Sequence, residues 1–321
     1  MSFVLTTALE RAAKHALPAP LDTATTSALE HLREGCFQRS LCLIVAATSV
    51  ASGLEVGYEH YKGSYSNPVM YTPVALSGAL AGAGLLGAFS RRGARTVLRW
   101  VSVVTLADGV IGFFFHIRGV ARKPGGWSLP VTNIVMGPPI FAPLLFGTSA
   151  YLGLMASFLR REEDLHTSEE TNRESAIEPS TRKGWRGNLG SGKFQKHLSA
   201  LALLWAFFSG FEALYSHYKT NFRYKAQWTP VLLTPLLMAS AAGAIKSPKI
   251  ANTALPIAST LALANGAVGF YYHARGILRR PGGVKKPLYN MLYGPPIFAP
   301  LLFAACGFLG LLASLLRREP K

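Results

Sequence analysis

Residues 137–146 read GPPIFAPLLF, and residues 294–303 read GPPIFAPLLF again. The same offset of 157 positions aligns His60 with His217 and His116 with His273, without insertion or deletion over the whole unit. The sequence therefore contains a tandem repeat, and each copy serves as a comparison for the other. We expect the polar residues retained in both copies to mark shared requirements of structure or function.

The composition indicates a membrane protein. Half of the 321 residues are hydrophobic, 15% are charged and the mean hydropathy is +0.25, whereas a soluble domain carries about 25% charged residues. A helix needs about 17–25 residues to cross the hydrocarbon core, and a lipid-embedded backbone must satisfy its own hydrogen bonds. Eight apolar runs have about this length: 41–58, 73–89, 97–115, 139–159, 198–215, 230–245, 250–272 and 296–316.

Each copy contains four of these runs, so both copies enter the membrane from the same side. The sequence thus predicts an all-α integral membrane protein with eight transmembrane helices, built as two tandem four-helix repeats related by a pseudo-two-fold axis along the membrane normal. The expected division is an N-terminal segment that is amphipathic or simply polar (1–36), a first repeat (37–159), a polar flexible linker (160–193), a second repeat (194–316) and a basic tail (317–321).

The basic residues predict the orientation. The side that holds both termini and the linker carries 21 of the 33 Lys and Arg residues, and the other side carries 12. The positive-inside rule then predicts a multi-pass protein of the cell (inner) membrane with both termini in the cytoplasm. Contacts with anionic lipid explain the net charge of +17. The chain has no nucleic-acid-binding motif, so we expect no nucleic-acid partner.

The retained acidic and imidazole side chains form the main candidate site. Glu55, His60 and His116 recur as Glu212, His217 and His273, all near one end of the predicted bundle. Carboxylate and imidazole groups bind iron, copper or zinc, and paired histidines are also axial ligands of haem. Carboxylates inside a membrane usually face a partner or a cavity. The favoured hypothesis is a metal- or haem-binding redox protein, which would include a membrane-bound metal-dependent oxidoreductase.

Two other functions remain open. The glutamates could bind a proton or a cation in a proton-coupled transporter, or the polar set could be a structural network in a scaffold or a subunit of a membrane complex. Five residues of ideal helix leave Glu55 and His60 about 140° apart, so they share a site only if the helix is interrupted. Tyr58 and Tyr215, three residues after each glutamate, are better placed to support it. Asp108 corresponds to Asn265, which confines that acid to the first copy.

A second retained pattern precedes the last run of each copy. It contains the basic residues Arg118, Arg122, Arg275 and Arg279. The Pro-Gly-Gly that follows predicts a tight turn, and the Pro-Pro of GPPIFAP predicts a helix start. Free amides at that start and the nearby arginines could hold an anionic lipid or an anionic substrate.

One motif is discounted. Gly82-x-Gly84-x-x-Gly87 matches a dinucleotide fingerprint in spelling, but it lies within an apolar run and follows no strand. With Gly78 it predicts close helix packing instead.

Overall fold

The computed structural model describes residues 19–164 and 191–316, and within them it contains helices and no strands. The predicted linker falls largely outside the described residues, as do residues 1–18 and the basic tail 317–321. The helices of the first part are α2 (Ala19–Arg33), α3 (Gln38–Lys62), α4 (Thr72–Phe89), α5 (Arg91–Gly93), α6 (Arg99–Ala121), α7 (Pro130–Val135) and α8 (Ala142–Ala156). Those of the second part are α11 (Lys193–Tyr218), α12 (Trp228–Lys246), α13 (Pro248–Asn252), α14 (Ala254–Leu278), α15 (Pro287–Leu292) and α16 (Ala299–Leu315).

Six of the described helical segments are long and apolar enough to cross a membrane: 38–62, 68–89, 91–121, 193–218, 225–246 and 254–278. The other two apolar runs form the shorter helices α8 and α16. The segment 91–121 is continuous because a π-helical stretch, Ala94–Leu98, joins α5 to α6. Length and composition therefore agree with a helical membrane protein.

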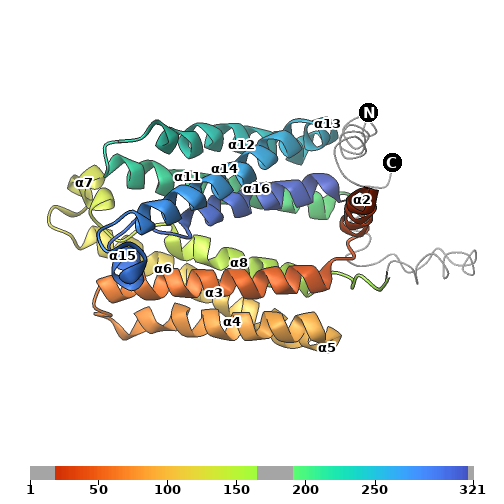
Figure 1. Cartoon of the computed structure of the whole chain (residues 1–321), viewed down its shortest axis with the longest axis horizontal. Helices are drawn as coiled ribbons and strands as arrows, with labels where there is room; N and C mark the ends of the chain where they lie inside the picture. The colour runs from red at the N-terminus through yellow and green to blue at the C-terminus, as the bar shows by residue number, and fades with distance from the viewer. Residues whose placement is uncertain (1–18, 165–190, 317–321) are drawn as a thin grey trace, which may run out of the picture.

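The long helices lie side by side along the longest axis of the molecule (Figure 1). The short helices α7 and α15 lie at one end, and α2, α5 and α13 lie at the other. Within the first sequence copy α3 packs on α4 and α8, and α6 packs on α8; within the second, α11 packs on α12 and α16, and α14 packs on α16. The two copies meet mainly through α8 and α11.

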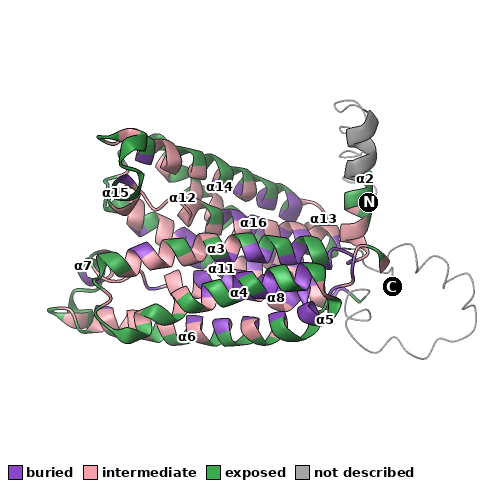
Figure 2. Cartoon of the chain, turned by 60° about the horizontal axis from the view of Figure 1, so that its bottom comes forward, coloured by how far each residue is buried: buried purple, intermediate pink, exposed green. Residues whose placement is uncertain are grey.

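One apolar core joins the two copies. Its largest fully buried side chains are leucines from both, among them Leu41, Leu98, Leu152, Leu198, Leu255 and Leu309. Figure 2 shows the buried residues gathered where the long helices meet, whereas their outward faces are exposed. Those outward faces carry large apolar side chains such as Phe89, Trp100 and Leu232, which is the distribution expected of a protein surrounded by lipid.

The glycine motif is only half used for packing. A Cβ on Gly84 would lie 2.9 Å from the Cys42 carbonyl oxygen, so α3 and α4 approach closely there. Gly78 and Gly82 have nothing within 4 Å of that position, which corrects the expectation for them. They point away from the helix interface because Gly82 and Gly84 are two residues apart, about 200° around the helix, and so lie on nearly opposite faces.

The Pro-Gly-Gly turns are confirmed, but the predicted helix start is wrong. Gly125 and Gly126 have φ of 79° and 46°, and Gly282 and Gly283 have 86° and 46°, the left-handed conformations that glycine adopts readily. Pro138 and Pro139 lie in a non-helical segment, and the helices begin later, at Ala142 and Ala299. The first-turn prolines are therefore those of the Ala-Pro-Leu-Leu sequence.

Candidate functional site

The retained glutamates are paired with the tyrosines of the next helical turn. Tyr58 donates a hydrogen bond to Glu55 on α3 at 3.4 Å, and Tyr215 donates one to Glu212 on α11. The spacing of three residues brings each pair to one face of its helix. Both tyrosines are buried, with 8% and 7% of their surface exposed.

The side chain of Glu212, in the second copy, also contacts the first copy. Its Oε1 accepts a hydrogen bond from the backbone amide of Phe141 at 2.7 Å, and the amide of Ala142 interacts with the same carboxylate. These amides belong to the start of α8, where helical N–H groups have no partner within the helix. A negative charge is stabilised at that end of a helix. Glu212 therefore links α11 to the first turn of α8.

Within the described residues, Glu55 of the first copy does not make the matching contact with the start of α16 in the second. By the sequence offset, Glu55 should cap α16 at Phe298. Within the described residues, the only hydrogen bond to the carboxylate of Glu55 comes from Tyr58. Two glutamates in equivalent sequence positions thus have different surroundings, and the contact between the copies is asymmetric.

Further charges line the boundary between the copies. Glu59 forms an ion pair with Lys62, with 3.1 Å between the carboxylate oxygen and the ammonium nitrogen. Glu59 also lies close enough to Lys219 and Tyr215 of the second copy to interact with them electrostatically. Partial burial lowers the pKa of Lys219, and the nearby Glu212 and Glu59 oppose this effect. Carboxylates of both copies therefore lie near Lys219, the ammonium group that interacts with Glu212.

The retained histidines connect helix ends to loops. The Nδ1 atoms of His60, His116 and His273 lie 2.7, 2.5 and 2.6 Å from the backbone oxygens of Met70, Pro139 and Pro296. Because a carbonyl oxygen can only accept, Nδ1 carries the proton and Nε2 is left as an acceptor. His217 interacts more weakly with the backbone of Gln227, which matches Met70.

The histidines come together as one pair in each copy. His60 and His116 are close enough for their charges to interact, and so are His217 and His273. Over residues 19–164 and 191–316, no group of three or more His, Cys, Asp or Glu side chains has the arrangement of a metal site. The glutamates bond to tyrosine and, for Glu212, to a helix start. The six residues expected to form one site are thus divided between two kinds of contact.

The four retained arginines lie on or near the surface. Arg118, Arg122 and Arg279 are exposed and Arg275 is partly exposed. No ion pair joins their side chains to an acidic group of the described residues. Their predicted role as anion ligands stays a prediction.

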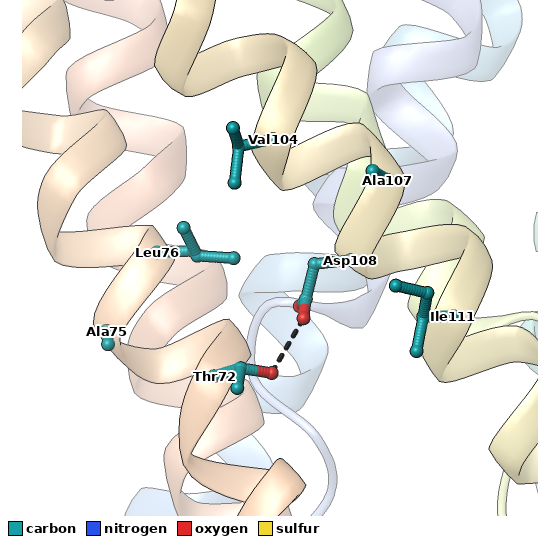
Figure 3. A pocket seen from close by; sticks show the side chains of 7 residues that line it. All are labelled: Thr72, Ala75, Leu76, Val104, Ala107, Asp108 and Ile111. Atoms are coloured by element: carbon teal, nitrogen blue, oxygen red, sulfur yellow. Dashed lines mark hydrogen bonds between the residues drawn. The ribbon is translucent and has the colours of Figure 1, made fainter.

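Asp108 lies in a groove between α4 and α6 (Figure 3). Its Oδ1 accepts a hydrogen bond from the hydroxyl of Thr72 at 2.6 Å. The second copy repeats this contact with a neutral group, because the Asn265 amide donates to Thr229 at 2.6 Å. The asymmetry seen in the sequence therefore removes the charge and reverses the direction of the hydrogen bond, while the contact with the threonine remains.

Two retained amide residues also matter, and the sequence interpretation did not single them out. Asn133 donates to the carbonyl oxygens of Pro124 and Gly126 at 3.1 and 2.7 Å, and Asn290 donates to Gly283 at 3.1 Å. Gln38, which matches Gln195, donates to the last carbonyls of α8 near Ala156. Their identity in both copies was the signal that could have revealed them. Buried amides hold turns and helix ends because those carbonyls lack helical partners.

No protein-family model, curated protein or solved structure matches this chain.

Proposed function

We propose that this protein crosses the cell (inner) membrane eight times, as two tandem four-helix units related by a pseudo-two-fold axis along the membrane normal, with both termini in the cytoplasm. Supporting this, α8 and α16 occupy matching sequence positions and both follow a non-helical segment, 137–141 or 294–298. Such a segment together with the short helix extends over the length of a span. Non-helical backbone at membrane depth is stable where protein buries it or where it lines a cavity.

Within this architecture the protein acts as a membrane proton carrier. The observation that supports this proposal is the carboxylate of Glu212 on the amides of Phe141 and Ala142, at the start of an interrupted span and at the boundary between two repeats. Transporters built from repeats bind their substrates and coupling ions at the repeat interface, often at the ends of discontinuous helices.

Protonation of Glu212 would couple to the packing of the two copies. An ionised carboxylate accepts an amide hydrogen bond more strongly than a neutral carboxylic acid does. Adding a proton therefore weakens the link between α11 and α8. Glu55, which has no such link within the described residues, is the equivalent group for the start of α16. Exchange between a Glu212–Phe141 link and a Glu55–Phe298 link would be a two-state motion that protons bias.

The test uses the purified full-length protein in liposomes that contain a pH-sensitive dye. A valinomycin-induced potassium diffusion potential, negative inside, should drive protons into protein-containing liposomes faster than into protein-free ones. Glu212→Gln and Glu55→Gln should abolish this entry. Glu163→Gln is the matched control, because Glu163 is an exposed residue outside the site. Equal proton entry with and without protein, or unchanged entry in both site variants, would overturn the proposal.

The histidine pairs support a second candidate function, a metal- or haem-linked redox protein. Nδ1 of His60, His116 and His273 is directed to a backbone oxygen, which is the arrangement that orients metal-binding imidazoles. Nε2 of His60 and His116 could then bind iron, copper or zinc together with ligands from solvent, a haem or a partner. Elemental analysis and an optical spectrum of the detergent-purified protein test this directly. A metal or haem signal lost in His60→Ala and His217→Ala would support it, and a colourless, metal-free protein would exclude it.

The exposed arginines fit a contact with anionic lipid. Arg118, Arg122 and Arg279 lie at the ends of α6 and α14 and form no ion pair with the residues that the structure describes. Guanidinium groups bind phosphate in a two-point geometry. We assign them to lipid headgroups at the membrane surface.

A further inference from the structure

A surface groove between α4 and α6 contains one isolated acid. The groove has a volume of about 460 Å³ and is lined by Thr72, Ala75, Leu76, Val104, Ala107, Asp108 and Ile111. Figure 3 shows Asp108 between the two helices, with the apolar side chains of Leu76, Val104 and Ile111 around it. Asp108 is the only ionisable residue in this lining.

Within the described residues, only one of the two oxygens of the Asp108 carboxylate accepts a hydrogen bond. Its Oδ1 accepts the Thr72 hydroxyl at 2.6 Å, and no other hydrogen bond or ion pair to Asp108 is present within the described residues. A charged group among apolar side chains needs a partner of opposite charge. The second carboxylate oxygen is therefore the natural place for a cation.

The groove faces the surroundings of the protein rather than the space between the copies. Val104 and Ile111 have 52% and 50% of their surface exposed, and α4 and α6 belong to segments with the length and composition of membrane spans. Thr72 is the first residue of α4, so the acid lies near one end of that helix. A ligand with an ammonium group and an alkyl chain could place its charge at Asp108 and its chain along the apolar helix surface.

The lining also argues against a phospholipid headgroup. A zwitterionic lipid such as phosphatidylethanolamine brings a phosphate next to its ammonium group, and that phosphate would need a basic or strongly donating partner. None of the seven lining residues is basic. The ligand chemistry that fits is a single positive charge on an apolar chain.

We propose that this groove binds an amphiphilic monocation from the membrane, with Asp108 as its counter-ion. At the matching position of the second copy Asn265 is hydrogen-bonded to Thr229, so the charge is absent there. The site thus belongs to the first copy alone. It does not use Glu55 or Glu212, so it stands independently of the proton-carrier proposal.

The experiment measures binding of dodecyltrimethylammonium to the full-length protein in phosphatidylcholine nanodiscs. Asp108→Asn should weaken binding by about tenfold or more, which corresponds to about 1.4 kcal/mol. This variant should fold, because the second copy already holds an asparagine at the matching position 265, where its amide donates to the hydroxyl of the matching threonine, Thr229. The exchange variant, Asp108→Asn with Asn265→Asp, should restore binding by moving the charge to the second copy.

Two controls separate the other sources of binding. Dodecyl maltoside, a neutral amphiphile with the same chain, should not compete with the cation. Phosphatidylethanolamine added to the nanodiscs should not compete either; competition by this lipid would assign the groove to a headgroup and overturn the proposal. Equal binding of the cation to wild type and to Asp108→Asn would overturn it as well.

Discussion

Glu212 of α11 accepts a hydrogen bond from the amide of Phe141 at 2.7 Å and so joins the second sequence copy to the start of α8 in the first. Glu55, its counterpart, makes no such contact within the described residues. The same residue in the same repeat position therefore has two structural roles. This difference can be measured.

Replacing each of the two glutamates by alanine should lower the free energy of unfolding by unequal amounts. Glu212→Ala leaves the Phe141 amide without its partner, and an unsatisfied buried donor costs about 1–3 kcal/mol. Glu55→Ala removes only a 3.4 Å contact with Tyr58 and should cost less. Unfolding of both variants in mixed detergent and SDS gives the two free energies. Equal losses would show that the asymmetry is not a property of the folded protein.

A matched pair of glycines tests the helix contacts. An alanine Cβ at Gly210 would lie 2.8 Å from the Cβ of Thr234, with both γ atoms of that threonine still closer. At the equivalent Gly53 it would lie 2.7 Å from the Cβ of Ser77. Overpacking costs about 1–3 kcal/mol, so both variants should lower the thermal unfolding temperature, Gly210→Ala more than Gly53→Ala.

The threonine explains the expected difference, so Thr234→Ser should restore part of the stability of Gly210→Ala. Gly78→Ala is the control, because nothing lies within 4 Å of its Cβ position. It should be neutral or slightly stabilising, since alanine is favoured over glycine in helices. A large loss at Gly78 would contradict the packing described above.

The boundary between the copies also contains a buried side-chain hydrogen bond. The Trp205 indole N–H of α11 donates to the Thr148 hydroxyl of α8, and both residues are buried. Thr148→Val should cost about 1–3 kcal/mol because the indole loses its acceptor. The double variant with Trp205→Phe should lose less than the sum of the single variants. Additive losses in this double-mutant cycle would show that the bond contributes no coupling.

Glu162 should make stability depend on pH at the start of α3. It accepts hydrogen bonds from the amides of Arg39 and Ser40 at 3.0 and 2.8 Å and from the Ser40 hydroxyl at 2.8 Å. Burial alone would raise the pKa of Glu162, but these hydrogen bonds outweigh it and hold the pKa below its usual value of 4.5. The unfolded state therefore binds the proton more tightly, so the contribution is complete above that value and is lost as pH falls through the lowered folded pKa.

Glu162→Gln should thus be destabilised by about 1 kcal/mol at neutral pH, as for loss of a helix cap. The difference in the free energy of unfolding between this variant and wild type should shrink below pH 4.5. Glu163→Gln provides the comparison, because its ion pair with Arg39 is about half exposed and contributes little. Thermal unfolding measured across pH follows both variants. A difference that stays constant into acid would contradict the proposed cap.

The histidine contacts predict which substitutions the fold tolerates. Asparagine can place an amide donor near the position of Nδ1, so His116→Asn should keep the bond to Pro139 and preserve stability. His116→Leu should lose it and destabilise the entry to α8. If His116→Asn unfolds as readily as His116→Leu, the Nδ1 contact is not what holds this segment.

Much of the architecture was predictable from local sequence. The apolar runs predicted helices, and the Pro-Gly-Gly turns predicted the left-handed glycines, because both depend on residues close in the chain. The start of α8 was predicted too early, at Pro138 and Pro139 rather than Ala142. The helix boundary depends on how the preceding segment packs, with the Asn133 carbonyl so close to Gly137 that no Cβ would fit.

The sequence by itself determined the helical class, the repeat and the list of retained polar residues, because hydrophobic length and residue identity are properties of the chain alone. Only the tertiary structure decided that Glu212 reaches Phe141 while, within the described residues, the Glu55 carboxylate accepts a hydrogen bond from Tyr58 alone. It also decided that His60, His116 and His273 bond to backbone oxygens. The repeat makes these glutamates equivalent in sequence. A hydrogen bond, however, requires two atoms within about 3 Å, and the packing of one copy against the other sets that distance.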